Sequence, residues 1–145
     1  MPVDVETAKK FIGEWRVQVS ETMGADEMGR AMGFPPIMID MFKRLEYSLS
    51  FTLEGQVVRV AFKFNNQLAP SGSITVGSGE KLDYPSPDGG IVKVIMNIED
   101  GIVTDVHEDS EKGLSWTTAR SVDGDVMTAV TTCRNETMRQ TFKRE

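Results

Sequence analysis

The sequence predicts an all-β protein whose antiparallel, up-and-down strands form a barrel or a sandwich, with a pair of helices after the first strand. Three observations lead to this fold class. From Glu46 onward, apolar residues recur mainly at every second position, which is the period of a half-buried strand. Turn residues such as Glu54-Gly55 and Asp123-Gly124 separate these segments at fairly regular spacing. A helical period is found only near the N-terminus.

Length and composition favour one soluble domain that spans residues 1–145. The net charge of -6 argues against non-specific binding of nucleic acid, which needs a basic surface. No run of about 18 apolar residues suggests a membrane span, and the segment from Met1 to Lys10 lacks the apolar core of a secretory signal. We therefore expect a cytoplasmic protein.

The single cysteine, Cys133, and the single histidine, His107, limit the chemistry further. One cysteine forms no internal disulfide, which fits a reducing compartment. One histidine and one cysteine do not supply the ligand sets of common zinc sites. We expect no metal and no cofactor.

The first strand is expected over Phe11–Val19, with Trp15, Val17 and Val19 on one face. Two short helices follow, over Ala25–Met32 and Pro36–Leu45. Gly33 ends the first helix, and a proline is tolerated in the first turn of the second. The second helix carries an apolar stripe that belongs either to the core or to a ligand contact, the core being preferred: Ile37, Met38, Met41, Phe42 and Leu45.

A β-hairpin is expected next, because Tyr47–Leu53 and Val58–Phe64 both alternate between apolar and polar residues around a tight turn. Pro85–Gly90 is a strong loop signal. Seven more strands bring the total to about ten: Ser73–Val76, Glu80–Tyr84, Ile91–Ile98, Ile102–His107, Leu114–Ser121, Asp125–Cys133 and Thr137–Lys143.

The expected inner faces mix apolar and polar side chains. Thr118 and Arg120 share the face of Trp116, and Asp105 and His107 share the face of Val103. Such mixed faces fit a partly hydrated interior cavity better than a dry core. We also place Thr128 on an inner face, together with Val126 and Val130.

The last strand places Met138, Gln140 and Phe142 on one face. A single amide between two apolar side chains is either a structural hydrogen-bonding group or the polar anchor of an apolar pocket. The residues alone leave both interpretations open.

Several motifs, in order along nearly the whole chain, resemble those of the intracellular lipid-binding proteins, which comprise the fatty-acid-binding and cellular retinoid-binding proteins. Phe11-Ile12-Gly13-Glu14-Trp15 is similar to their opening Phe-x-Gly-x-Trp, and Asp26–Gly33 is similar to their first helix. The spacing of Trp116-Thr117, Asp123-Gly124 and Gln140–Arg144 resembles that of their C-terminal strands.

This resemblance implies a ten-stranded, flattened, closed barrel (a lipocalin-like clam) with a two-helix lid after strand 1. It also implies a non-catalytic, monomeric carrier of one hydrophobic ligand such as a fatty acid, a retinoid or another lipid, with transient membrane contact during transfer. The portal would be lined by Ile37, Met38 and Met41, by the turn at Phe62–Asn66 and by the turn at Pro85–Asp88.

The departures from the family pattern concern the head group of the ligand. Where fatty-acid binders carry Arg-x-Tyr, this sequence has Gln140 and Phe142, and where they carry a second arginine it has Thr118. Arg120, about 7 Å further along the same strand, would supply a cation if it pointed inward, and an anionic lipid would then suit the site. If Arg120 were solvated at the rim, neutral ligands would be preferred.

Two other functions remain open from the sequence: a small enzyme that uses His107, Asp105 or Arg120 on an apolar substrate, and a barrel that serves only as a scaffold. For a carrier, we expect the ligand to contact ten residues: Gln140, Phe142, Arg120, Thr118, Trp116, Met38, Met41, Phe62, Phe64 and His107.

Overall fold

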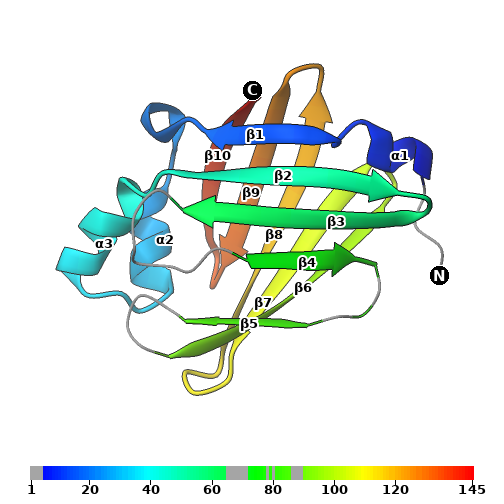
Figure 1. Ribbon diagram of the computed structural model, residues 1–145. Coiled ribbons are helices and arrows are strands. Elements are labelled where there is room, and N and C mark those ends of the chain that lie inside the picture. Colours follow the sequence, from blue (N-terminus) through cyan, green and yellow to red (C-terminus); the bar gives the residue numbers. More distant parts are fainter. Residues whose placement is uncertain (1–4, 65–71, 78, 80, 86–89) are drawn as a thin grey trace.

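The computed structural model describes residues 5–64, 72–77, 79, 81–85 and 90–145. These residues form one antiparallel sheet with three α-helices and one short 3₁₀ helix (Figure 1). The strands are β1 Gly13–Val17, β2 Tyr47–Glu54, β3 Val57–Phe64, β4 Gly72–Val76, β5 Leu82–Pro85, β6 Ile91–Glu99, β7 Ile102–Asp109, β8 Leu114–Asp123, β9 Val126–Cys133 and β10 Glu136–Arg144.

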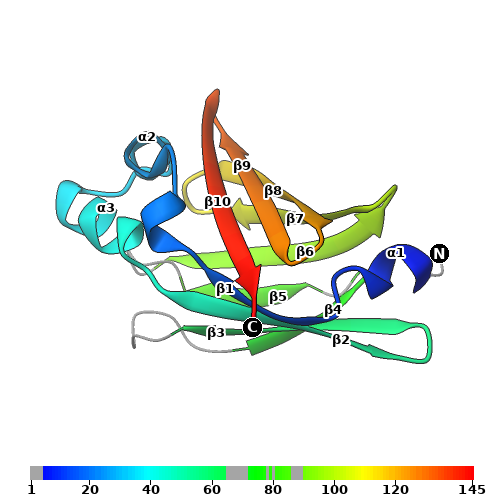
Figure 2. The ribbon, with the colours of Figure 1, turned by 90° about the horizontal axis from the view of Figure 1, so that it is seen from above.

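The sheet curls into a nearly closed barrel, so the predicted barrel is confirmed (Figures 1 and 2). The strand order is β4-β3-β2-β1-β10-β9-β8-β7-β6-β5, in which the first strand pairs with the last. Within the described residues no ladder joins the edge strands β4 and β5. The backbone N–H of Gly77, just after β4, instead donates to the carbonyl of Met96 on β6 at 2.8 Å.

The seam between β1 and β10 is held by Arg144, which lies opposite Trp15 in the ladder. Its guanidinium carbon lies 4.1 Å from the centroid of the indole ring, and its Nη1 donates to the carbonyl of Ile12. The indole N–H in turn donates to the carbonyl of Phe11 at 2.8 Å. Gly13, at φ 130°, makes room for this arrangement, because a Cβ there would lie only 2.7 Å from Nη1 of Arg144.

The main core lies inside the barrel, where alternate residues of the strands face one another. The short helix α1 (Val5–Lys9) packs at the end of the barrel opposite the lid (Figure 2). Each large apolar side chain in this core stabilises the fold by about 1.5–3 kcal/mol. The largest fully buried ones are Phe11, Trp15, Phe51, Phe142, Ile74 and Met127.

The lid consists of α2 (Ala25–Ala31) and α3 (Pro36–Lys43), which follow the 3₁₀ helix η1 (Val19–Glu21) and cover one end of the barrel (Figures 1 and 2). Gly33 ends α2 at φ 81°, and Pro36 opens α3, as predicted. Cys133 on β9 is buried beneath α2, and its Sγ lies 3.9 Å from the carbonyl oxygen of Ala31. A second core joins the lid to the barrel: Met28, Met32, Phe34, Ile39, Leu114, Cys133 and Met138.

The structure corrects the sequence prediction at three places. Val19 begins η1 instead of ending the first strand, and α1 was not predicted. On β9 the inward residues are Met127, Ala129, Thr131 and Cys133, so the inward placement of Thr128 is wrong. The ladder with β10 fixes this face, because Met127 pairs with the inward Phe142, and a shift by one residue exchanges the two faces of a strand.

Part of the expected portal lies outside the described residues. This applies to residues 65 and 66 of the Phe62–Asn66 turn, to residues 86–88 of the Pro85–Asp88 turn and to the side chain of Phe64. Glu80, the expected first residue of a strand, also lies outside them. The lid side of the portal is described.

The packing of α2 on α3 depends on Gly29, so we expect Gly29→Ala to destabilise the protein. A Cβ at this position would lie 2.8 Å from Cγ1 of Ile39. Overpacking of this kind costs about 1–3 kcal/mol, which over most of that range exceeds the gain of about 1 kcal/mol that alanine brings to a helix. Urea unfolding would measure the difference. The exposed Glu27→Ala in the same helix is the control and should stay within about 0.5 kcal/mol of wild type; equal stabilities would contradict the prediction.

Candidate functional site

An ion pair between Arg120 on β8 and Asp105 on β7 lies inside the barrel. Nη2 of Arg120 donates to Oδ2 of Asp105 at 2.9 Å, and Nε approaches the same oxygen at 3.3 Å. Only 7% of Arg120 and 4% of Asp105 are exposed. Of the two positions left open by the sequence, Arg120 therefore occupies the inward one, although it is only three residues from the end of its strand.

The two groups hold each other in the charged state. Burial opposes ionisation of Asp105, but the charge of Arg120 and the hydrogen bond with His107 outweigh it, so the pKa of Asp105 is lowered. Burial likewise opposes the charge on Arg120, but the negative charge of Asp105 outweighs it, so the pKa of Arg120 is raised. The pair is therefore ionised and carries no net charge.

One nitrogen of the guanidinium has no partner. Nη1 of Arg120 is buried and makes no hydrogen bond with any described residue. The Phe142 ring lies beside the guanidinium, with its centroid 5.5 Å from Cζ. An unsatisfied buried donor costs about 1–3 kcal/mol, and native proteins leave few such groups without a function or a missing partner.

Gln140 lies in the same transverse row as Arg120, because both residues pair with Ala129 of β9. Its Oε1 accepts a hydrogen bond from the Tyr47 hydroxyl at 3.1 Å. No described residue accepts a hydrogen bond from its amide nitrogen. Gln140 keeps accessible surface although Met138 and Phe142, its neighbours on the same face, are buried. The amide N–H group is therefore available inside the barrel.

Tyr47 contacts both Gln140 and the aromatic ring of Phe142. Its ring packs edge-on against Phe142, with centroids 5.5 Å apart and an interplanar angle of 76°. Burial raises the pKa of the Tyr47 hydroxyl, and the charge of Arg120 offsets only part of that effect. Tyr47 is therefore a neutral phenol at neutral pH, and it donates to Gln140.

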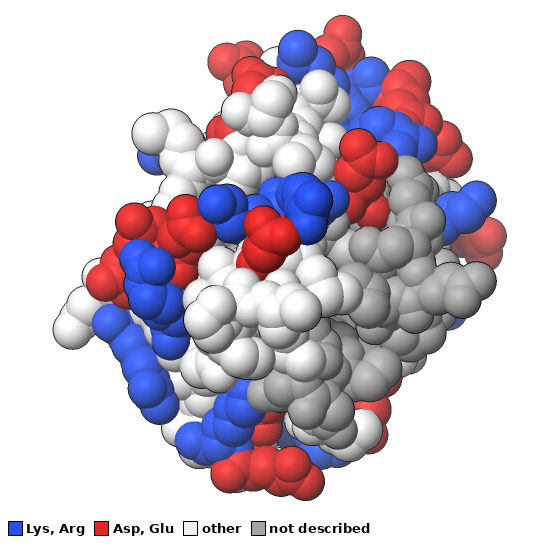
Figure 3. Space-filling model, turned by 90° about the vertical axis from the view of Figure 1, so that its left-hand side faces the viewer, with Lys and Arg blue, Asp and Glu red and all other residues white. Residues whose placement is uncertain are grey.

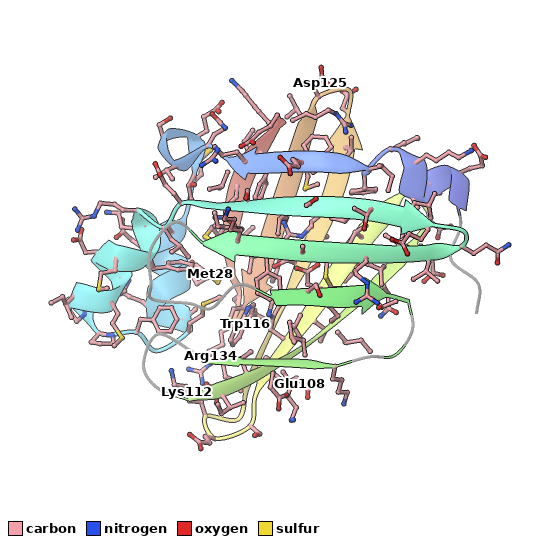
Figure 4. All side chains as sticks on the ribbon, viewed as in Figure 1. Met28, Glu108, Lys112, Trp116, Asp125 and Arg134 are labelled. Carbon is pink, nitrogen blue, oxygen red and sulfur yellow. The ribbon has the colours of Figure 1, made fainter. Side chains whose placement is uncertain are left out.

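The other inward polar residues lie closer to the lid along the strands. The hydroxyl groups of Thr118 and Thr131 share a hydrogen bond of 2.8 Å and are both buried. His107 stacks flat on Trp116, with centroids 5.4 Å apart, and its Nε2 lies 3.7 Å from Oδ2 of Asp105. Trp116 packs against the buried residues beneath the lid, and its side chain is labelled in Figure 4 among those of the barrel.

The remaining predicted contacts lie apart from this polar cluster. Met38 packs against the core beneath the lid, and Phe62 packs against the main core. Met41 is half-buried on α3, whereas Ile37 is 73% exposed. The structure thus brings together Arg120, Gln140 and Phe142, and next to them Thr118, His107 and Trp116.

Sequence reasoning missed two members of the cluster as ligand contacts, Tyr47 and Asp105, and a third polar neighbour, Thr131. Tyr47 is the first residue of an alternating run, and Asp105 lies two residues from His107 on the predicted inner face. Those signals placed Asp105 on an expected inner face and Tyr47 on the apolar face of the expected hairpin. The pairing of each with a residue more than ten positions away was not visible.

The lid surface carries alternating charges. Ion pairs link Lys43 to Asp26 at 3.2 Å and Arg44 to Asp40, and basic and acidic side chains are interspersed at this end of the molecule (Figure 3). A groove of about 370 Å³ lies between α2 and α3, and its lining residues are Asp26, Arg30, Phe34, Pro36, Ile39, Asp40 and Lys43. This groove contains no member of the polar cluster.

Two absences concern the described residues only. No helix among them is long and apolar enough to cross a membrane. None of their His, Cys, Asp and Glu side chains form a group of three or more that could hold a metal ion.

Solved structures with the same architecture are numerous. The fatty acid binding protein of Schistosoma mansoni, in complex with arachidonic acid, superposes with a TM-score of 0.78 at 21% identity, over 96% of this chain and 98% of that one. The Echinococcus granulosus fatty-acid-binding protein 1 gives 0.72 at 20% identity, over 94% and 98%. This chain has the fold of the fatty-acid-binding proteins. No family model matches the sequence, and no curated protein matches it.

The same fold also occurs under a different description. Secretory abundant heat soluble protein 4 of Ramazzottius varieornatus gives a TM-score of 0.78 at 15% identity, over 94% of this chain and 96% of that one. The fatty-acid-binding fold therefore accommodates very different sequences, and the function of this chain has to be argued from its own interior residues.

The buried ion pair yields a prediction about stability. Arg120→Met would leave Asp105 buried without its partner, and we expect a loss of about 3–5 kcal/mol in the free energy of unfolding. The double variant Arg120→Met/Asp105→Leu should recover most of that loss, because it leaves no buried charge unpaired. Urea unfolding of the two variants and wild type would measure both effects.

The control for this prediction is the exposed ion pair between Lys93 and Asp83, which has the same length of 2.9 Å. Lys93→Met should cost no more than about 1 kcal/mol, since exposed pairs contribute little. Similar losses for Arg120→Met and Lys93→Met would show that burial of the inner pair has no energetic consequence.

Proposed function

We propose that this protein is a non-catalytic carrier that binds one hydrophobic ligand inside the barrel and holds its polar end against Arg120 and Gln140. The observation that carries the proposal is the unpartnered Nη1 of the buried Arg120, next to the free amide nitrogen of Gln140. Folding to a state with two unused donors in the interior is unfavourable unless a ligand or water accepts from them.

The surroundings of these donors suit an apolar ligand. Aromatic side chains around the cluster, among them Tyr47, Phe142 and Trp116, offer large contact areas with few polar atoms. Two of them, Tyr47 and Trp116, keep some accessible surface, as expected of residues that line a binding site. An apolar wall with a few convergent donors is typical of small-molecule sites. The fatty acid binding protein of Schistosoma mansoni, which has the same fold and was solved in complex with arachidonic acid, supports an apolar ligand.

The enzyme alternative rests on His107 and Asp105, which do face the interior and lie 3.7 Å apart. Asp105 is already committed to the ion pair with Arg120, and His107 is stacked on Trp116. The buried thiol of Cys133 has a raised pKa because of burial, so it stays protonated and a poor nucleophile. These contacts favour structural and binding roles, and we place the carrier ahead of the enzyme.

The proposal includes a monomeric carrier in the cytoplasm, where the free thiol of Cys133 would stay reduced. Transient contact with membranes remains part of it. The lid carries basic and acidic side chains in similar measure, so attraction to anionic lipids would be weak. Exposed apolar residues such as Ile37 on α3 would make the contact.

Protein purified without organic solvent should retain lipid, at up to about one molecule per chain. Native mass spectrometry would detect the added mass, and extraction followed by lipid analysis would identify it. The delipidated protein should bind a neutral fluorescent dye such as Nile red saturably, with displacement by apolar ligands. Absence of co-purified lipid together with failure to bind any ligand of a broad lipid panel would contradict the carrier function.

Gln140→Arg should shift ligand preference toward carboxylates, because a second guanidinium would give the cluster a net positive charge and a bidentate partner for an anion. We expect about a tenfold change or more in the ratio of affinities for a fatty acid and the matching alcohol. Thr141→Arg adds the same charge on the opposite face of β10 and should leave the ratio unchanged. Equal effects of the two variants would show that Gln140 does not contact the head group.

A further inference from the structure

We infer that the polar end of the ligand is an uncharged oxygen acceptor, such as the carbonyl of an ester or aldehyde, and that Asp105 is the residue that rejects carboxylates. This inference rests on the proposed carrier function and assigns its ligand class. It follows from the charges around Arg120 and from the donors that remain free.

The charge of Arg120 is already compensated. Asp105 accepts from both Nη2 and Nε of the guanidinium, at 2.9 and 3.3 Å, and both residues are more than nine-tenths buried. A ligand carboxylate at Nη1 would add a second negative charge to a buried group that holds one positive charge. Like charges this close in a weakly polarisable interior repel strongly. An arginine without such a partner would attract the same carboxylate.

The free hydrogen-bonding groups are donors. Nη1 of Arg120 has no acceptor among the described residues. The amide oxygen of Gln140 already accepts from the Tyr47 hydroxyl, so the amide nitrogen is the group of Gln140 that is left to bind a ligand. Both residues pair with Ala129, whose small side chain separates them on the inner face. Two donors on residues that flank one alanine match one oxygen with two lone pairs, as in a carbonyl group.

The other titratable groups around Arg120 do not supply the missing positive charge. Tyr47 is neutral, because burial raises its pKa. His107 lies on the same strand as Asp105, and its Nε2 approaches Oδ2 at 3.7 Å, on the Asp105 side of the cluster. In the described part of the polar cluster, the cation that a carboxylate would need is therefore Arg120. Its charge is already compensated by Asp105.

The test compares dodecanoate with methyl dodecanoate, which share a chain and differ in head-group charge. Affinities would be measured by displacement of Nile red at neutral pH from wild type and from Asp105→Asn. Asparagine keeps the shape of the side chain and removes its charge. We expect the ratio of affinities to move toward dodecanoate by about tenfold or more in Asp105→Asn.

Asp109→Asn is the matched control. Asp109 lies on the same strand and the same inward face and is also buried, but it is four residues from Asp105, about 13 Å along the strand, and accepts from the backbone N–H of Lys112 at 3.2 Å. Its neutralisation should leave the ratio unchanged. A ratio that did not move in Asp105→Asn, or that moved equally in Asp109→Asn, would overturn the inference while the carrier function stood.

A measurement on wild type alone covers the case in which Asp105→Asn does not fold. Protonation removes the charge of dodecanoate, so its affinity for wild type should rise as the pH is lowered toward the pKa of the ligand, while methyl dodecanoate binding stays constant. Affinity that fell on protonation would indicate a cationic clamp and contradict the inference. If wild type bound neither these compounds nor any ligand of the broad lipid panel, the carrier function itself would be wrong, and the head-group assignment with it.

Discussion

The pairing of the first strand with the last makes this molecule a barrel. β1 shares a ladder with β2 on one side and with β10 on the other. This joins the strands β1–β4 to the strands β5–β10, which no ladder connects at β4 and β5 in the described residues, and makes one ten-stranded sheet that curls into a nearly closed barrel. At this pairing Arg144 lies close to Gly13 and against the Trp15 ring. Once the ends are joined, most inward side chains face other side chains instead of bulk water, and a polar group that is buried there needs a partner.

The polar cluster shows how this constraint is met. Most of its groups satisfy one another: Arg120 with Asp105, Thr118 with Thr131, and Tyr47 with Gln140. What remains are donor nitrogens on Arg120 and Gln140, at one level of the barrel. Most polar groups of the cluster therefore have partners within the protein. The donor nitrogens that have none define where a ligand would have to place an acceptor. This excess of free donors comes from two residues on different strands and not from a single sequence motif.

The fold was largely predictable from the sequence because period-two alternation is a local property. The hairpin of β2 and β3, the lid helices with their Pro36 and Gly33 boundaries, and the inward faces of β7 and β8 agree with the pattern. The inward face of β9 was predicted wrongly, because Val126, Thr128 and Val130 form as plausible a strand face as their neighbours do. Only the ladder with β10 decides between the two faces.

The site was less predictable than the fold. The sequence placed Arg120 and Asp105 on the inner faces of separate strands, but whether they met depended on strand register and side-chain reach. The two outcomes considered for Arg120 were an inward free cation and a solvated cation at the rim. The structure shows a different state, an inward cation that is already neutralised. A single amino-acid sequence does not show which residues on different strands pair with each other.

The position of Cys133 makes its rate of alkylation a measure of how often the lid opens. The thiol is 2% exposed and lies under the last residue of α2, near the carbonyl of Ala31, and burial raises its pKa. It is the chain's one cysteine, so alkylation of the folded protein reports on a single position. When opening is fast compared with the reaction, the labelling rate is proportional to the fraction of molecules in which α2 has left the barrel end. Departure of the helix can thus be compared with and without a ligand in the interior, and no cysteine has to be engineered for it.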